Sequence, residues 1–407
     1  MTKQLMVGID LHSNNLFCGV VDSDGKRVFE RKLPCELGVV LGALAPFKER
    51  IAAVAVESTY NWYWLVDGLQ DAGYEMRLAN PAGMEQYSGL KHGDDRTDAY
   101  FLAELLRLNI LPTGHICDRH LRSVRDLLRR RMLLVRQRTS LILSVKCLHA
   151  RTLGQALGAD EVKTMSAREA QEGFTHPADQ LVGKVEGTMI AELGKGIRQI
   201  EKMVLAMTRP MPGYKVLLGL PGVGKILALT ITLETAGVAR FPTAGNYASY
   251  CRCVKSLRLS NGKKKGEGNG KCGNKYLSWA YVEAANFAKR YDEESRRFFD
   301  RKTARTNNIV ATKALACKLA KAAWHMMSQG SPYDPRRMFP NAAHGAKTPG
   351  FNALKPIPQA GMPERKSLPV PVCGIRTEGG ARVASQQSPI LRFGKKQSNP
   401  KPKTGKI

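Results

Sequence analysis

The stretch that decides the fold runs from residue 5 to residue 33 and reads LMVGIDLHSNNLFCGVVDSDGKRVFERKL. It contains three runs typical of β-strands, at 5–10, 16–22 and 27–33. The D-S-D-G-K segment between the second and third runs is typical of a hairpin turn. The sequence therefore predicts an antiparallel meander of three strands, the first of which is buried and ends in Asp10.

After this meander, helix and strand patterns alternate. The run IAAVAVE, at 51–57, is apolar and ends in an acid, as the first strand does. The predicted elements are a helix over 36–50, a strand over 51–57, a helix around 61–72, a strand over 74–79 and a helix over 97–109. A meander followed by such alternation predicts a ribonuclease-H-like α/β domain over residues 1–113.

Residues 114–212 are predicted to form a helical connector with coiled-coil character. In the Arg- and Leu-rich segment 118–152, leucines recur every seven residues, namely Leu127, Leu134, Leu141 and Leu148. This period is typical of a coiled coil or of the seam of a helix bundle. Arginines three and four residues apart predict a basic outer stripe that binds nucleic acid, namely Arg122, Arg125 and Arg129. With a second helix predicted over 186–206, the connector is expected to mediate oligomerisation.

The last two segments differ in composition. Residues 213–340 are predicted to form a second, mainly α-helical domain. From about residue 341 the chain is rich in Pro, Lys, Ser and Gln, and nine of its 21 prolines lie in 341–407. Because this tail has little material for a core, we expect it to be disordered and to add non-specific affinity for polyanions.

The net charge indicates a polyanionic partner. The 407 residues contain 63 Lys and Arg against 35 Asp and Glu, for a formal net charge of +28. The excess lies behind residue 113, because 1–113 carries 11 basic and 15 acidic residues whereas 213–340 carries 23 and 8. So positive a surface binds nucleic acid by counterion release. An anionic membrane surface or a purely solubilising role are the alternatives.

The sequence argues against a membrane protein and a secreted protein. No run approaches the ~18–20 apolar residues of a membrane span, and the first residues lack the pattern of a signal peptide. The nine cysteines are odd in number, widely spread and without a C-x-x-C pair, so reduced thiols are expected. We therefore expect a cytoplasmic, nucleoid-associated protein that does not contact a membrane.

Four carboxylates form a candidate metal site. Asp10 and Glu57 end strands that are neighbours in this fold, and Asp95 and Asp98 lie three residues apart on one face of a predicted helix. An all-oxygen set without a His or Cys cluster favours Mg²⁺ over zinc, and a two-metal site suits phosphodiester chemistry. The alternative is that the strand-ending acids are turn formers or helix caps and that Asp98 caps the helix. Asp94, next to Asp95, is interpreted as a solvated loop acid.

A glycine-rich segment, LLGLPGVGK, lies at residues 217–225. It nearly matches a phosphate-binding P-loop, but Ile226 stands where the hydroxyl of a Ser or Thr is needed. The better interpretation is a helix–hairpin–helix element, whose exposed backbone N–H groups bind a nucleic-acid phosphate at Gly222, Gly224 and Lys225. A tight turn with packing value alone is the alternative.

A second glycine-rich loop follows Ser260. It reads S-N-G-K-K-K-G, and five lysines make it a candidate phosphate trap, namely Lys263, Lys264, Lys265, Lys271 and Lys275. No partners for an acyl-transfer triad are evident, so an esterase or peptidase is disfavoured. From composition, Ser260 is either a turn residue or a nucleophile that surrounding cations assist, and Ser256 and Ser278 carry the same ambiguity.

Several motifs occur here in a specific order: V-G-I-D-L-H, A-V-E-S-T-Y, D-R-T-D-A, G-L-P-G-V-G, and S-N-G-K-K-K-G followed by G-N-K-Y-L. Over roughly residues 5–330 this ordered set resembles the insertion-sequence transposases of family one-hundred-and-ten, most closely subgroup eleven-eleven. These proteins are the DEDD transposases, or bridge-RNA-guided recombinases. The basic, Pro-rich tail is the clearest departure from the family.

The resemblance implies a RuvC-like domain whose metal-binding acids are Asp10, Glu57, Asp95 and Asp98, and a C-terminal transposase domain whose nucleophile is Ser260. It also implies donor and target DNA, a structured guide RNA and a homo-oligomer, a dimer or tetramer, as partners. The two domains that form one composite site would come from different subunits. The expected function is a Mg²⁺-dependent DNA recombinase that acts through a transient phosphoserine link.

Two alternatives keep part of this interpretation. The first is a metal-dependent, structure-specific nuclease of the junction-resolvase kind, which cuts by water and forms no covalent serine intermediate. The second is a nucleic-acid-binding module that has lost catalysis, against which the four intact acids argue.

Overall fold

The computed structural model describes residues 4–90, 93–254, 257–267 and 272–340. Ser256 and Lys271, and the predicted disordered tail over 341–407, lie outside these ranges. Residues 1–344 cluster as one unit, so the boundaries predicted at 113 and 212 stay predictions.

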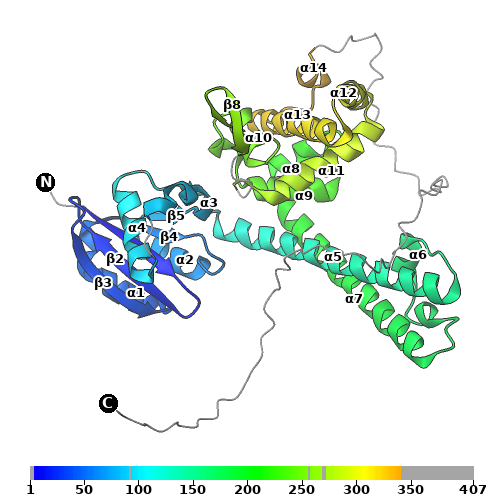
Figure 1. Cartoon of the computed structure of the whole chain (residues 1–407), viewed down its shortest axis with the longest axis horizontal. Helices are drawn as coiled ribbons and strands as arrows, with labels where there is room; N and C mark the ends of the chain where they lie inside the picture. The colour runs from blue at the N-terminus through cyan, green and yellow to red at the C-terminus, as the bar shows by residue number, and fades with distance from the viewer. Residues whose placement is uncertain (1–3, 91–92, 255–256, 268–271, 341–407) are drawn as a thin grey trace, which may run out of the picture. The chain divides into compact units, whose positions relative to one another are not determined.

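The N-terminal part contains one mixed sheet of six strands in the order β3-β2-β1-β4-β5-β6 (Figure 1). Its strands are β1 (Leu5–Leu11), β2 (Asn15–Val21), β3 (Arg27–Pro34), β4 (Ile51–Glu57), β5 (Met76–Ala79) and β6 (Thr113–Gly114). The first three strands form the predicted antiparallel meander, and β4 and β5 add in parallel to β1. The α/β prediction is confirmed, and the strand order is consistent with a ribonuclease-H-like domain.

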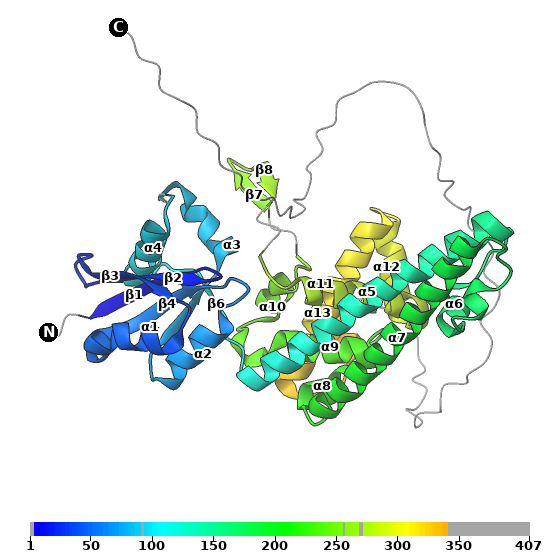
Figure 2. The same ribbon diagram turned by 90° about the horizontal axis from the view of Figure 1, so that it is seen from below.

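Helices cover both faces of this sheet (Figure 2). They are α1 (Leu37–Leu44), η1 (Ala45–Arg50), α2 (Tyr63–Asp71), α3 (Pro81–Met84), η2 (Glu85–Leu90) and α4 (Asp95–Arg107). Side chains of α1 and α2 share one core with β1, whereas α4 packs on the opposite face. A Cβ on Gly8 would lie 2.0 Å from the Ala99 carbonyl oxygen, so only glycine lets α4 lie this close to β1. The close packing fixes where the first turn of α4 meets the sheet.

Two long helices follow, α5 (Arg119–Leu153) and α7 (Pro177–Thr208), and they pack against each other along much of their length (Figures 1 and 2). The chain segment that connects them contains two short helices, α6 (Ala159–Thr164) and η3 (Glu169–Gln171). The leucine seam is displaced from the prediction, because Leu127, Leu134 and Leu141 are only half-buried. Leu148 of the predicted seam is buried, and the other buried positions of α5 include Leu128, Ile142 and Val145. The buried face of α5 therefore packs against α7 of the same chain.

The C-terminal part is mainly helical, as predicted, and contains one hairpin. Its elements are α8 (Pro212–Leu217), α9 (Lys225–Thr235), η4 (Val238–Arg240), α10 (Ala244–Tyr250), β7 (Leu257–Ser260), β8 (Lys263–Glu267), α11 (Lys275–Tyr291), α12 (Glu293–Thr303), α13 (Asn308–Gln329) and α14 (Pro335–Met338). Small side chains such as Ala284 and Ala316 are fully buried where α9, α11 and α13 meet. The cysteines in the described ranges are free thiols. No helix in those ranges is long and apolar enough to span a membrane.

Candidate active site

Three elements bring four carboxylates to one edge of the sheet. Strands β1 and β4 pair in parallel with Ile9 opposite Val56, so the residues that follow them, Asp10 and Glu57, emerge side by side. Helix α4 contributes Asp95 and Asp98 in its first turn. Each of the other three acids raises the pKa of Asp10, so the four predicted acids share one electrostatic site.

His12 belongs to the same site. Its Nδ1 lies 3.5 Å from Asp10 Oδ2, and its Nε2 lies 3.3 Å from Asp95 Oδ1. One ligand atom from each of these three residues lies within 4.8 Å of the others. One histidine thus joins the acids, a member of the site that the sequence interpretation did not include. The available signal was the D-L-H spacing, because residues two apart on a strand share a face.

Asp10 is the buried member of the cluster. Only 6% of its surface is exposed, and burial is the main cause that raises its pKa to about 6. The charges of Asp98, Asp95 and Glu57 raise this pKa further, whereas His12 opposes the shift. Asp10 Oδ2 accepts no hydrogen bond from any described residue. A buried, unsatisfied carboxylate among other acids fits a divalent cation, because the cation would supply the missing positive charge.

The cap of α4 is Asp94. Its side chain accepts a hydrogen bond from the Thr97 backbone N–H at 2.6 Å, and hydrogen bonds from Thr97 lower its pKa. The alternatives that made Asp98 the cap and Asp94 a solvated loop acid are therefore wrong. Because Asp94 satisfies the end of the helix, the side chains of Asp95 and Asp98 are not needed for capping.

The loop after Glu57 is tied to the end of β1. Asn61 Nδ2 donates to the His12 carbonyl oxygen at 2.8 Å, and Thr59 Oγ1 donates to Asn61 Oδ1 at 2.9 Å. These two hydrogen bonds hold the backbone beside both His12 and Glu57. The loop is therefore a fixed wall of the site.

Ser260 ends β7 at the tip of the hairpin. Asn261 and Gly262 have φ values of 50° and 70°, which is the two-residue turn that Asn-Gly favours, and Ser260 pairs with Lys263 across it. Ser260, Lys263 and Lys265 are exposed. Within the described ranges Ser260 makes no hydrogen bond with the acids. The hairpin thus presents a serine hydroxyl and lysines to solvent.

The other predicted lysines divide into two groups. Lys275 begins α11, and its ammonium lies 5.3 Å from the ring centroid of Tyr276. Lys264 lies on β8, but its side chain is not among those that the structure describes. Lys271 falls outside the described residues altogether. A role for these lysines on phosphate stays a prediction.

The two glycines of the G-V-G turn have different physical roles. Gly222 has φ +76°, and a Cβ there would lie 2.1 Å from the Ala284 carbonyl oxygen. Gly224 caps α9 with an ordinary φ of −88°, and a Cβ there would meet no described atom within 4 Å. The packing interpretation therefore accounts for Gly222. Gly224 and the exposed Lys225 stay available to a phosphate.

The predicted basic outer stripe on α5 is wrong for Arg122. Arg122 is 2% exposed, forms an ion pair with Asp67, and stacks 4.1 Å from the ring centroid of Tyr63. Arg125 donates to the Tyr63 hydroxyl, and Arg129 pairs with Glu234. The helical period correctly predicts that the three arginines share one face of α5. Much of that face packs against the rest of the protein, so Arg122 has no free surface for a phosphate.

Comparisons with known proteins match the two parts that carry these residues. A family model for DEDD transposases of the IS110 type, described as transposase, matches residues 7–149, which include the four acids. A second model, described as the transposase IS116/IS110/IS902 family, matches residues 214–300, which include Ser260. The chain is also similar to an insertion element IS110 uncharacterized 43.6 kDa protein of Streptomyces coelicolor. The two are 29% identical over 140 residues, which is 34% of this chain and 35% of that protein. The chain thus matches about a third of the length of this relative.

Proposed function

From the two domains of IS110-family DEDD transposases that this chain carries, we infer that it is a DNA transposase, which excises an insertion element and joins it to a new site. The observation that carries the proposal is the convergence of Glu57, Asp95 and Asp98 on Asp10, a buried carboxylate whose Oδ2 has no hydrogen-bond partner among the described residues. Such a site suits phosphodiester chemistry, because metal ions held by the acids would stabilise the negative charge on the scissile phosphate. The strongly basic part behind residue 113 supports DNA as the partner.

We propose Mg²⁺ as the cofactor of the acid cluster. Asp10, Glu57, Asp95 and Asp98 would hold it, with His12 within reach of two of them. A bound Mg²⁺ supplies Lewis-acid stabilisation of the charge on phosphate oxygens. The protein contributes the arrangement: β1 and β4 fix two carboxylates, and the Asp94 cap fixes the helix turn that carries the others.

We propose that Ser260 is the nucleophile. Its Oγ would attack a backbone phosphorus, so that a bond from Oγ to phosphorus forms while the P–O bond to the departing strand breaks. The serine hydroxyl would give up its proton to water, and the departing strand oxygen would take up a proton from water to end as a hydroxyl. The phosphoserine ester keeps the bond energy for rejoining. Lys263 and Lys265, exposed beside Ser260, would neutralise the phosphate. A composite site built from different protomers of a dimer or tetramer would explain why, within the described ranges, Ser260 forms no hydrogen bond with the acids of its own chain.

The finer proposal is that a structured RNA from the element pairs with donor and target DNA. The resemblance of the motifs to guided recombinases supports this proposal. In such systems base pairing reads the sequence, and the protein binds shape and backbone through positive charge. The helix–hairpin–helix element of the C-terminal domain, at Gly224 and Lys225, would supply backbone contacts.

The test is a recombination assay on a donor plasmid that carries the element with its flanking non-coding segment. We expect Asp10→Ala and Ser260→Ala to abolish excision and joining, whereas Ser140→Ala, at an exposed serine on α5, leaves both unchanged. A denaturing gel of wild-type reactions should show protein covalently attached to DNA. If Ser260→Ala still joins DNA, the serine step is wrong, and cleavage without an adduct would indicate the resolvase-like nuclease instead.

A separate experiment tests the RNA proposal. Purified protein stripped of RNA is expected to recombine DNA only after the transcript of the non-coding segment is added. Changing the predicted pairing bases of that transcript should redirect joining to a matching target. Recombination that proceeds equally without the transcript would contradict RNA guidance and leave the transposase proposal standing.

A further inference from the structure

A cavity of about 720 Å³ lies beside the loop that follows Glu57. Its lining starts with Ser58 and Thr59, the two residues that directly follow Glu57, and continues along α5 to residues near the start of α11. All of these residues belong to the unit that spans 1–344. Because the loop of Ser58 and Thr59 is hydrogen-bonded to the end of β1 through Asn61, the cavity and the acids share a wall.

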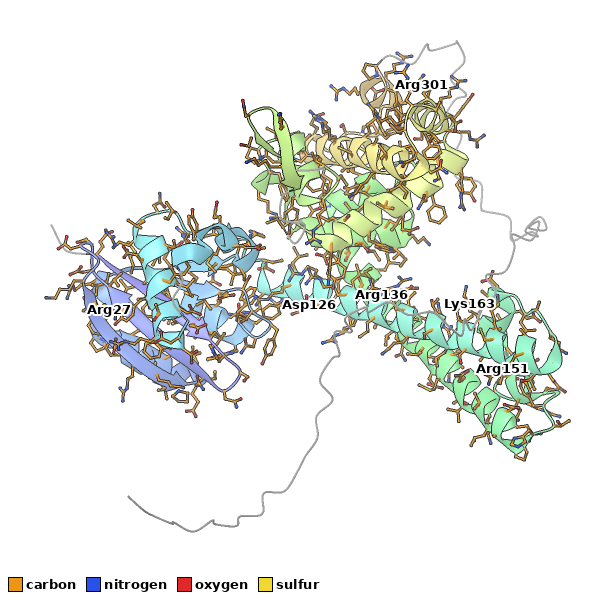
Figure 3. The ribbon with its side chains drawn as sticks, in the orientation of Figure 1. Arg27, Asp126, Arg136, Arg151, Lys163 and Arg301 are labelled. Carbon is orange, nitrogen blue, oxygen red and sulfur yellow. The ribbon has the colours of Figure 1, made fainter. Side chains whose placement is uncertain are left out.

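The cavity carries surplus positive charge. Five arginines line it, namely Arg125, Arg129, Arg130, Arg136 and Arg240, against two carboxylates. Both carboxylates already have protein partners: Glu234 accepts hydrogen bonds from Arg129, and Asp126 accepts one from Tyr63 at 2.6 Å. Arg130 and Arg136 are exposed on α5, and neither forms an ion pair with another described residue (Figure 3 labels Arg136). The cavity therefore attracts an anion.

Aromatic rings line the same space. Tyr60 is 82% exposed on the loop after Glu57. The guanidinium of Arg240 lies 4.5 Å from the ring centroid of Tyr250, and that of Arg129 lies 4.5 Å from the centroid of Tyr276. Rings and guanidinium planes are the surfaces on which unpaired bases stack. The lining thus offers both of the groups that bind a nucleotide: cations for phosphate and flat faces for bases.

The size of the cavity selects the form of the nucleic acid. A volume of about 720 Å³ lies within the ~300–1,000 Å³ range of ligand pockets. A duplex does not fit such a space, because its major groove alone is ~12 Å wide. The bases of a duplex are also already stacked on one another, so their faces are not free to stack on the tyrosines. A few unpaired nucleotides fit, and their free base faces can reach the tyrosines.

We propose that this cavity binds a single-stranded stretch of nucleic acid as it leaves the acid cluster, with bases stacked on Tyr60, Tyr250 and Tyr276 and phosphates held by Arg130 and Arg136. The inference rests on the proposed function, since the strand that enters the cavity is the one that passes the acids. The shared chemistry is an unpaired polynucleotide, which either the separated DNA strand or the guide RNA supplies.

The test measures binding without cleavage. The full-length protein is titrated in EDTA into short fluorescein-labelled single-stranded DNA, single-stranded RNA of the same sequence, and the DNA duplex, and anisotropy gives each Kd. We expect Tyr60→Ala to raise the Kd for a single strand by a factor of about 5 to 150 and to change the Kd for duplex by less than about twofold. Tyr291→Ala is the matched control, because Tyr291 is 79% exposed on α11 and does not line the cavity.

A second pair of variants tests the arginines. Arg136→Gln should reduce the slope of log K against log salt concentration for single strands by about 0.7, the value expected for one phosphate contact. Arg151→Gln is the control, because Arg151 is exposed on the same helix and does not line the cavity. Figure 3 labels both arginines. Both variants keep the basic tail, so its contribution cancels in the comparison.

Several outcomes decide the inference. Equal affinities for wild-type protein and Tyr60→Ala, equal losses in the Tyr60 and Tyr291 variants, or an unchanged salt slope in Arg136→Gln would overturn it. A loss confined to DNA assigns the cavity to the cut strand, and a loss confined to RNA assigns it to the guide; both support it. If the cavity variants lose single-strand binding but wild-type protein never cuts DNA with Mg²⁺, the proposed function fails and the inference stands.

Discussion

Arg129 on α5 donates from Nε and Nη2 to the two carboxylate oxygens of Glu234 on α9, each at 2.7 Å. Glu234 is 3% exposed, and it also accepts a 2.7 Å hydrogen bond from Asn274 Nδ2. Asn274 in turn caps α11 by accepting from the backbone N–H groups of Tyr276 and Leu277. One buried carboxylate therefore joins the long helix to two helices of the C-terminal part.

Arg129→Met should lower the free energy of unfolding by about 3–5 kcal/mol. The substitution keeps the side chain long but leaves the Glu234 charge buried, with Asn274 as its one remaining hydrogen-bond partner among the described residues. Urea denaturation followed by circular dichroism measures the change. Arg130→Met, at the exposed neighbour, is the control and should change stability by less than about 0.5 kcal/mol.

The double variant Arg129→Met with Glu234→Leu separates an ion pair from simple packing. Removing both charges should recover most of the lost stability, because no uncompensated carboxylate then remains buried. A double variant no more stable than Arg129→Met alone would contradict the electrostatic explanation and indicate that the arginine acts by packing.

The sequence was sufficient to predict where the acids converge. A buried meander followed by alternating helices and strands leaves a parallel β1–β4 pair, so two acids that end those strands must be neighbours. The spacing of Asp95 and Asp98 then predicted their shared face on α4. These inferences succeed because they depend on periods of two and 3.6 residues, which are local properties of the chain.

The misses concern properties that depend on distant partners. The period of α5 shows which arginines share a face, but only the fold shows that Asp67, Trp62 and Tyr63 lie against Arg122. His12 was missed because the D-L-H spacing offers one histidine near one acid, which alone is not a metal-binding cluster. The D-D-R-T-D segment contains several acids able to cap α4, and only the extended backbone of Asp94 decides among them.

Asp10→Asn should stabilise the metal-free protein at neutral pH. The pKa of Asp10 is about 6 in the folded protein against 3.8 for an ordinary Asp, so folded protein binds the proton more tightly than unfolded protein does. Ionisation therefore costs stability as pH rises from about 4 to 6, and the cost persists above that range. The neutral amide escapes this cost.

The measurement compares Asp10→Asn with wild-type protein by denaturation in EDTA across this pH range. The free energy of unfolding of the variant should exceed that of wild-type protein by about 1–3 kcal/mol at pH 7.5, and the difference should shrink toward pH 4. A difference independent of pH would show that the carboxylate charge is not its cause.

Divalent cations should stabilise wild-type protein and fail to stabilise Asp95→Asn to the same extent. A cation bound only by the folded site adds about 1.4 kcal/mol when its concentration is ten times its Kd. Melting temperatures with and without Mg²⁺ or Mn²⁺ provide the measurement. Asp94→Asn is a charge-matched control at the adjacent position, because asparagine keeps the helix cap. Equal loss of the cation effect in both variants would indicate general charge screening in place of ligation.

Gly222→Ala and Gly224→Ala should separate packing from binding within one turn. At position 222 a methyl group would lie 2.1 Å from the Ala284 carbonyl oxygen and 2.7 Å from the Ala288 nitrogen, and the backbone φ there is +76°. Gly222→Ala should therefore lower the free energy of unfolding by about 2–5 kcal/mol. At position 224 no described atom lies within 4 Å of the added methyl group, so stability should fall by less than about 1 kcal/mol.

If the start of α9 holds a backbone phosphate, Gly224→Ala should still weaken duplex DNA binding, because the methyl group crowds the N–H groups that point at the anion. Denaturation curves and anisotropy titrations on the same preparations measure both effects. A Gly224→Ala protein that binds duplex as wild-type protein does would leave this turn with a packing role alone.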